Sequence, residues 1–288
     1  MTGKQVRVVL PYGKQKRFFE LDEKRLLGVF SPGDCEPAKS ATSEVIRSLE
    51  NPIGTSGLRT ILRRNRKVAI AVDDNTRATP VRLVLPALTR HFGLRRDDVQ
   101  VIVALGTHRK MMKAEMEEKY GKDTVQEYEF VNHAFDEHEQ LKIVGKFPDG
   151  APVWVNRSFL NADVRIGIGN IVPHFSAGWS GGSKIVLPGL TGEETVGWMH
   201  YVSAMERPNA LGLVENSGRM LMDWVAEKVG LNLIIDTVLN RREEIVKVFS
   251  GNHVEAHRKG VEFAKRVYNV DVPGRADITV SSIDSLLD

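Results

Sequence analysis

The sequence predicts an α/β fold, in which a largely parallel sheet has its strands joined by crossover helices. Three continuous apolar runs, at residues 67–74, 98–108 and 162–170, indicate strands that are buried on both faces. Segments with a helical spacing of apolar residues alternate with such runs, which is typical of parallel α/β sheets. The chain has 288 residues, of which 42% are hydrophobic, enough for one large α/β domain or two smaller ones.

The expected elements follow in chain order. Residues 6–10 are predicted as a first strand and residues 41–50 as a helix. The apolar run at 67–74 ends in two aspartates, and a helix is expected at 81–94 although it contains Pro86. After the run at 98–108, a short polar helix stops at Gly121. The remaining expected elements are helices at 193–206, 217–229 and 252–269, strands at 232–240 and 244–251, and a last strand at 276–282.

The loop after the third apolar run, "PHFSAGWSGGSKIVLPG" at 173–189, holds four glycines, three serines and one lysine. Such a loop suggests a cradle for phosphate, because backbone N–H groups can approach an anion closely where no Cβ intervenes. The usual phosphate-loop pattern, G-x-x-x-x-G-K-[ST] before a helix, is not matched. Lys184 is followed instead by the apolar residues 185–187 and Pro188, which are predicted as strand.

Polar residues follow three of the predicted strands. Arg77, His108, and the pair His174 and Lys184 each come from a loop after one apolar run. Ligands of parallel sheets lie in the crevice beyond the carboxyl ends of the strands, so these four residues converge on one edge if the three strands are parallel.

Each of these residue types admits two interpretations. Arg77 can hold a carboxylate or phosphate through its fork of donors, or it can pair with the aspartates of a helix cap. His108 and His174 can exchange protons with a substrate hydroxyl, or can simply bond a nearby carbonyl. Lys184 can be a phosphate counter-ion, a Schiff-base amine or a point of covalent attachment, or else an ordinary surface lysine.

Other histidines lie on predicted helices. His200 can bind a soft metal or fill a half-buried position. His253 and His257 have the i, i+4 spacing of metal ligands, but no third ligand is near them in the sequence. We therefore expect His253 and His257 to be surface or helix-cap residues.

Composition argues against several classes of protein. There are 40 basic and 37 acidic residues, and the basic ones cluster only at 62–67, so no nucleic-acid partner is expected. Cys35 is the single cysteine, which excludes a disulfide within the chain and fits a reducing cytoplasm. Because no segment has the ~20 apolar residues of a membrane span and none resembles a secretory signal, we expect a soluble cytoplasmic protein.

Four segments together resemble the nickel-pincer-nucleotide lactate racemase family. They are "VDDNTRATP" at 72–80, "ALGTHR" at 104–109, "GNIVPHFSAGWSGGSKIVLPGL" at 169–190 and "TGEETVGWMH" at 191–200. The similarity extends from "LPYGK" near the start to about residue 275. It implies the N-terminal domain of a two-domain family. Residues 1–275 would form a cofactor-binding domain, and residues 276–288 would begin a C-terminal domain that is truncated or absent.

The resemblance also implies a role for each candidate residue. Lys184 would be joined through a thioamide to a pyridinium-3,5-bisthiocarboxylic acid mononucleotide, the nickel-pincer nucleotide, and His200 would complete the coordination of its nickel. His108 and His174 would be the acid/base pair, and Arg77 would hold the substrate carboxylate. Further contacts to the cofactor are expected from Asp73, Thr76, Ser180, Gly181 and Gly182.

The implied activity is racemisation or epimerisation of a 2-hydroxy acid, with lactate, malate and others open as substrates. One histidine would take the hydroxyl proton as hydride passes from C2 to the cofactor, and the other would return a proton after hydride adds to the opposite face. Separate maturation enzymes would install the cofactor. The alternative is a non-catalytic module that binds the cofactor or a nucleotide. A phosphoryl-transfer enzyme is a third candidate, against which the order Ser183-Lys184 argues.

Overall fold

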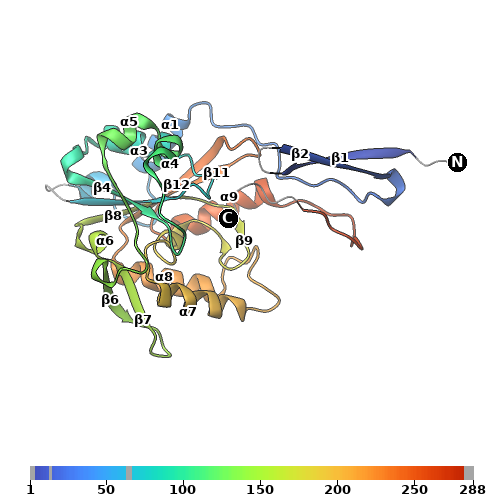
Figure 1. Ribbon diagram of the computed structural model, residues 1–288. Coiled ribbons are helices and arrows are strands. Elements are labelled where there is room, and N and C mark those ends of the chain that lie inside the picture. Colours follow the sequence, from blue (N-terminus) through green and yellow to red (C-terminus); the bar gives the residue numbers. More distant parts are fainter. Residues whose placement is uncertain (1–3, 13–14, 63–66, 282–288) are drawn as a thin grey trace.

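A six-stranded sheet forms the centre of the protein (Figure 1), of which a computed structural model describes residues 4–12, 15–62 and 67–281. Its strands lie in the order β12-β11-β8-β3-β4-β5, and only β12 at the edge is antiparallel to its neighbour. The predicted, largely parallel α/β fold is therefore confirmed. The strands are β3 (Val68–Asp73), β4 (Val99–Ala104), β5 (Glu129–Asn132), β8 (Val164–Asn170), β11 (Leu233–Leu239) and β12 (Ile245–Gly251).

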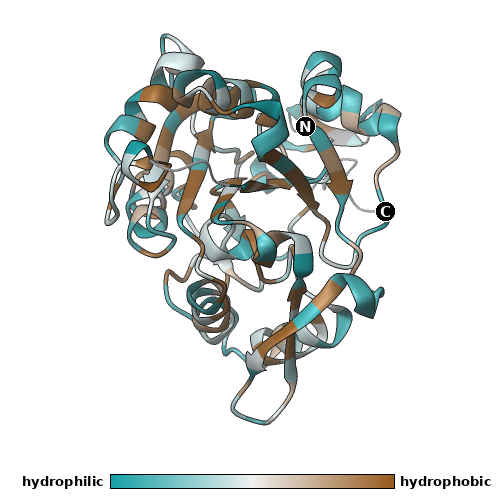
Figure 2. Ribbon diagram, turned by 90° about the vertical axis from the view of Figure 1, so that its left-hand side faces the viewer, coloured by the Kyte–Doolittle hydropathy of each residue, from teal (hydrophilic) through white to brown (hydrophobic). Residues whose placement is uncertain are grey.

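Helices cover both faces of the sheet, and its strands are the most apolar part of the fold (Figure 2). One face is covered by α1 (Ala41–Glu50), α2 (Leu58–Ile61), α3 (Val81–Phe92), α4 (Lys113–Tyr120) and α5 (Lys122–Glu127). The other is covered by α6 (Arg157–Asn161), α7 (Glu193–Ala204), α8 (Ser217–Val229) and α9 (Glu255–Tyr268). Short 3-10 helices are η1 (Glu23–Arg25), η2 (Arg96–Asp98), η3 (His138–Gln140) and η4 (Gly182–Ile185).

Three two-stranded sheets complete the structure. The hairpin of β1 (Gln5–Tyr12) and β2 (Gln15–Asp22) projects away from the central sheet (Figure 1). β6 (Leu141–Lys146) pairs with β7 (Pro152–Asn156), and β9 (Pro173–His174) pairs with β10 (Gly178–Trp179). The strand expected at 6–10 is confirmed, whereas the second strand of its hairpin was not predicted.

The order in which strands are added to the sheet reverses between β3 and β8. From β3 at the centre, the chain proceeds to β4 and β5 on one side and later to β8 and β11 on the other. The carboxyl ends of β3 and β8 therefore diverge into loops that leave in opposite directions, which is where ligands bind in open α/β sheets. The loops after β3, β4 and β8 contain the candidate residues, and these three strands are parallel as expected.

Two of the expected strands are wrong. Residues 185–187 belong to η4 and the turn after it, because their apolar side chains pack on a face of the central sheet instead of extending it. Short apolar runs do not distinguish a strand from a buried turn. The strand expected at 276–282 is also absent over residues 276–281, which are exposed and pair with no strand of the described chain. Residue 282 and most of the basic run at 62–67 lie outside the described residues.

No helix within the described ranges is both long enough and apolar enough to cross a bilayer.

Candidate active site

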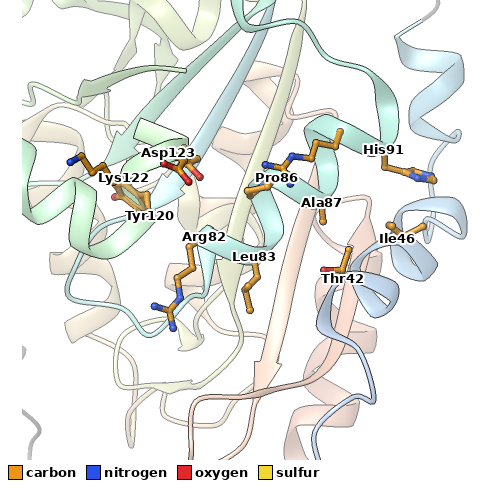
Figure 3. Close-up of a pocket in the computed structure, with 13 residues that line it drawn as sticks. Thr42, Ile46, Arg82, Leu83, Pro86, Ala87, His91, Tyr120, Lys122 and Asp123 are labelled. Carbon is orange, nitrogen blue, oxygen red and sulfur yellow. The ribbon is translucent and has the colours of Figure 1, made fainter. Parts of the chain in front are cut away.

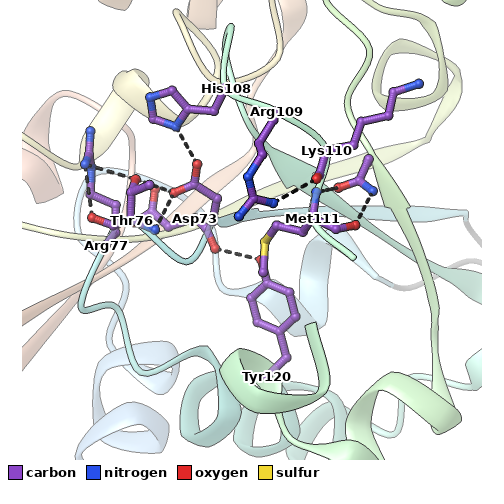
Figure 4. Close-up of polar contacts among 10 residues, drawn as sticks. Asp73, Thr76, Arg77, His108, Arg109, Lys110, Met111 and Tyr120 are labelled. Carbon is purple, nitrogen blue, oxygen red and sulfur yellow. Dashed lines mark hydrogen bonds and ion pairs between the residues drawn. The ribbon is translucent and has the colours of Figure 1, made fainter. Parts of the chain in front are cut away.

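The end of β3 holds an Asp–His pair. Nδ1 of His108, in the loop after β4, lies 2.6 Å from Oδ2 of Asp74 (Figure 4). Oδ1 of Asp74 accepts hydrogen bonds from the backbone N–H and the hydroxyl of Thr76, at 3.0 and 2.5 Å. Burial acts to raise the pKa of Asp74, but the hydrogen bonds from His108 and Thr76 outweigh it, so the net pKa is lowered. A carboxylate at Nδ1 of His108 places the imidazole proton there and leaves Nε2 free to accept another.

Arg77 lies in the same loop and is held from behind by α4. Its guanidinium Nη1 donates to the carbonyl and hydroxyl oxygens of Thr76, each at 3.2 Å. Nζ of Lys119 donates to the backbone carbonyl of Arg77, and the hydroxyl of Tyr120 donates to that of Asp73 at 2.9 Å. The backbone that places Arg77 is therefore fixed at two carbonyl groups, while the rest of its guanidinium can meet a ligand.

In His174, on β9, Nδ1 is a hydrogen-bond acceptor, whereas in His108 it is the protonated nitrogen. Nδ1 of His174 accepts hydrogen bonds from the backbone N–H groups of Ser176 and Ala177, both at 3.3 Å. Burial, followed by the positive charges of Lys184 and Arg77, lowers the pKa of His174 to about 2. The neutral ring therefore has its proton on Nε2, since Nδ1 must remain an acceptor.

Lys184, in η4, is a partly exposed lysine whose Nζ makes no hydrogen bond or ion pair with the described residues. Burial and the charge of Arg77 lower its pKa to about 8, against the opposing effect of Asp73. A free amine is therefore available near neutral pH, which is the state needed for a nucleophile.

His200 lies exposed on α7 and faces the same space. Partial desolvation and the charge of Lys184 lower its pKa, and His200 in turn contributes to the lowered pKa of His174. His174 is thus within electrostatic reach of Lys184, Arg77 and His200, and Lys184 is within reach of Arg77 and of Asp74, the partner of His108. The structure thus brings together all the residues expected at the edge of the sheet.

In the glycine-rich turn, the side chain of Ser180 forms hydrogen bonds within the loop, whereas Gly181 and Gly182 supply unusual backbone conformations. Ser180 donates its hydroxyl proton to the carbonyl of Asn170 at 2.6 Å and accepts from the N–H of Val172, so its side chain closes the loop. Gly181 and Gly182 have φ values of +78° and +61°, a conformation that favours glycine.

Asp73, at the end of β3, is partly buried, and its carboxyl accepts a hydrogen bond from the hydroxyl of Thr79 at 2.6 Å. Burial raises the pKa of Asp73.

Sequence reasoning missed the buried partners of this turn. They are Arg219 and Asp223 on α8, Asp236 on β11 and His257 on α9, together with Asp74 as the partner of His108. The sequence contained one sign of them, because Asp236 and Thr237 interrupt the apolar run at 233–239. A carboxylate inside a strand buried on both faces needs a specific partner.

The expectation that His253 and His257 are surface or cap residues is wrong. They are 4% and 3% exposed, and Nε2 of His257 donates to the carbonyl of Ser180 at 2.9 Å. The imidazole of His257 packs under the glycine-rich turn, since a Cβ on Gly182 would lie 2.9 Å from its Cγ. His253 precedes α9, and its Nε2 lies 4.0 Å from Oε2 of Glu227 on α8. The two rings therefore have different partners.

A hollow in the surface lies away from the candidate site. It has a volume of about 650 Å³ and lies between α1, α3 and the start of α5 (Figure 3), on the face of the sheet that does not hold η4. None of the expected site residues lines this hollow. The convergence of charged and titratable groups, and not cavity size, locates the candidate site.

Residues 12–212 match the family described as the lactate racemase N-terminal domain. The chain belongs to this family. It is 33% identical over 281 residues to the lactate racemase of Thermoanaerobacterium thermosaccharolyticum, and 31% identical over 283 residues to that of Lactiplantibacillus plantarum. Each alignment covers 96% of this chain and 66% of the relative, so the chain spans just under two thirds of the length of these relatives.

Solved structures of similar proteins agree with the family's fold. The lactate racemase apoprotein from T. thermosaccharolyticum superposes with a TM-score of 0.79 at 32% identity, covering 91% of this chain and 63% of that one. A protein from Thermotoga maritima superposes with a TM-score of 0.64 at 26% identity, covering 83% and 61%.

Gly178 of the family's glycine-rich segment is required by the backbone itself. Its φ is +74°, and a Cβ there would lie 1.9 Å from the carbonyl oxygen of Leu213. We expect Gly178→Ala to lower the free energy of unfolding by about 3 kcal/mol, because it combines backbone strain with a clash against main chain. Urea denaturation measures this change. Gly197→Ala in α7, where a Cβ meets nothing within 4 Å, is the matched control and should stabilise by up to about 1 kcal/mol. A loss below about 0.5 kcal/mol for Gly178→Ala would contradict the argument.

Proposed function

We propose that the protein racemises or epimerises a 2-hydroxy acid of the lactate class, using a nickel-pincer nucleotide bound covalently to Lys184. The observation that supports this most directly is the pair of histidines from different loops. One is bonded through Nδ1 to a carboxylate and the other through Nδ1 to backbone N–H groups. Such a pair offers one proton acceptor and one proton donor to the same ligand, as inversion of a hydroxyl-bearing carbon requires.

The residues present fit the proposed cofactor. Lys184 offers an amine without a partner in the described chain, as a thioamide link needs. The backbone N–H groups of Gly181 and Ser183, although buried, donate to no group among the described residues. Buried N–H groups are seldom left without an acceptor, so the N–H of Gly181 is a candidate donor to a phosphate or carboxyl oxygen of the cofactor. Ser183 is 0% exposed, so its N–H could meet such an oxygen only if the turn shifts.

The proposed nickel ion would need only one ligand from the protein. No group of three His, Cys, Asp or Glu side chains able to hold a metal ion is found in residues 4–12, 15–62 and 67–281. The pincer's own sulfur and carbon donors would hold nickel with the imidazole of His200, a ligand set that suits this metal. When bound, the cofactor would supply a reversible acceptor for the C2 hydride.

The protein's own residues would bind the substrate and move its proton. Arg77 would hold the carboxylate through the guanidinium donors that Thr76 does not use. Nε2 of His108 would take the proton of the 2-hydroxyl, because Asp74 holds the other nitrogen in its protonated form and stabilises the imidazolium.

His174 would become active only in the loaded site. After burial, the charges that lower its pKa most are those of Lys184 and Arg77. Thioamide formation would remove the charge of Lys184, and a bound carboxylate would neutralise that of Arg77. The pKa of His174 would then rise. Delivery of its Nε2 proton to the face opposite His108 leaves a neutral ring only if Nδ1 is also protonated, so Nδ1 would have to give up the N–H groups of Ser176 and Ala177 in the loaded site.

The test is interconversion of D- and L-lactate, and of other 2-hydroxy acids, by the full chain co-expressed with cofactor maturation enzymes. Nickel content and denatured intact mass are measured on the same samples. Racemisation together with a covalent mass increment supports the proposal. A mass increment without turnover of any 2-hydroxy acid would favour the cofactor-binding module instead. Neither property, where a family member matured in parallel shows both, would refute it.

Before loading, His174 is expected to be neutral between pH 5 and pH 8, since its pKa of about 2 lies far below this range. Long-range ¹⁵N–¹H NMR of the ring should show a proton on Nε2 and none on Nδ1, with His174→Gln identifying the signal. The unfolded chain protonates this residue near a pKa of about 6.5, so its burial makes the free energy of unfolding fall as pH drops below that value. Protonation of the folded-state ring above pH 5 would contradict the expectation.

A further inference from the structure

Four side chains, of which Arg219, Asp236 and His257 are buried and Asp223 is half-buried, form hydrogen bonds to each residue of the glycine-rich turn from 179 to 183. Arg219 donates from Nη1 to the carbonyl of Gly181 at 3.0 Å and from Nη2 to that of Trp179. His257 donates to the carbonyl of Ser180. Further along the turn, Asp236 accepts the N–H of Gly182 at 2.7 Å, and Asp223 accepts the hydroxyl of Ser183 at 2.6 Å.

The turn depends on these partners because its backbone has little preference of its own. Gly181 and Gly182 are adjacent glycines, both with positive φ, and glycine populates many other conformations at similar energy. The contacts are also close. A Cβ on Gly181 would lie 2.8 Å from Oδ2 of Asp236, and one on Gly182 would lie 2.9 Å from Cγ of His257. The backbone of Gly181 and Gly182 therefore packs directly against Asp236 and His257, with no room for a Cβ.

Two of these partners are ionisable groups in the interior, and burial raises the pKa of Asp236 to about 7. Arg219 is 3% exposed and Asp236 is 1% exposed, and Nε of Arg219 has no hydrogen-bond partner among the described residues. Burying an ionisable side chain costs free energy unless its polar atoms are well paired. Stability alone therefore does not account for them, whereas fixing one backbone conformation does.

We propose that Arg219 and Asp236 are positioning residues that fix the Gly181–Gly182 turn and thereby present Lys184 for attachment of the cofactor. This inference rests on the proposed function. Lys184 lies two residues after Gly182 within η4, so the direction of its side chain follows from the conformation of that turn. Displacement of a reacting group by about 1 Å can slow a reaction about 100-fold.

The experiment measures the rate at which intact mass shows cofactor attachment to the full chain during maturation. Asp236→Ala removes the acceptor of the Gly182 N–H, and we expect attachment to slow at least about tenfold. Asp236→Asn keeps an acceptor oxygen and should restore attachment to within about threefold of wild type. Val225→Ala, which opens a cavity at a fully buried position in the helix that also holds Arg219, is the control for lost stability.

A second readout needs no cofactor. Hydrogen exchange of the unloaded chain should show faster exchange in peptides covering 178–185 for Asp236→Ala and for Arg219→Lys, whose single ammonium cannot replace a fork that reaches two carbonyls. Val225→Ala should leave these peptides unchanged.

The outcomes separate the two proposals. Attachment at the wild-type rate in Asp236→Ala, or equal slowing in Val225→Ala at matched stability, would overturn the positioning role. If wild type itself acquires no cofactor, the proposed function fails, and exchange still tests the hold on the turn. Unchanged exchange at 178–185 in Asp236→Ala would refute that as well.

Discussion

Lys184→Ala is expected to abolish both the covalent mass increment and racemisation, because the proposed cofactor would lose its point of attachment. The lysine is suited to this role by its position. Its amine lies at a partly exposed site, is unpaired within the described chain and has a pKa of about 8, so it offers a substantial free-base fraction at pH 7.5. Activity should fall to the uncatalysed background, a loss of at least about 10⁶-fold in rate for an enzyme of ordinary efficiency.

Two further variants isolate the reason for the loss. Lys184→Arg preserves the positive charge but cannot form the thioamide, so it should fail as completely as Lys184→Ala. Lys122→Ala, an exposed lysine at the start of α5 and remote from η4, should retain both the increment and the activity. An unchanged increment in Lys184→Ala would show that the cofactor is attached elsewhere.

Much of the framework around Lys184 was predictable because it depends on local composition. The strands β3, β4 and β8 are continuous apolar runs, and each ends in polar or glycine-rich residues. Parallel pairing then follows from the intervening helices and places their carboxyl ends at one edge. This is why Arg77, His108 and Lys184 could be expected together before their contacts were known.

The partners of these residues were not predictable, because they come from distant parts of the chain. Asp236 and His257 lie more than 50 positions from the turn that they hold, and only the packing of β11 and α9 brings them there. The short run at 185–187 was misassigned for a related reason. Its apolar residues face the core in a turn, and periodicity over three residues cannot distinguish that arrangement from a strand.

Asp74→Asn is expected to lower kcat by about 10²- to 10⁴-fold while leaving cofactor attachment intact, because it reverses the proton position on His108. The backbone N–H of Thr76 donates to Oδ1 of Asp74. An asparagine would keep its oxygen at that position, since a backbone N–H requires an acceptor, and would turn its NH₂ group toward Nδ1 of His108. That nitrogen would then have to accept a hydrogen bond, and the imidazole proton would move to Nε2, the atom proposed to take the substrate proton.

The same variant separates orientation from folding. Intact mass and thermal unfolding should remain close to wild type, because the substituted side chain has the same shape and can keep its contact with Thr76. Only turnover should change, and steady-state assays in both directions, D to L and L to D, measure it. The two directions must slow by the same factor in kcat/KM, since the variant cannot alter the equilibrium between the enantiomers. Turnover within about threefold of wild type would show that His108 does not act through Nε2, and His108 would lose its assignment as one of the two acid/base residues.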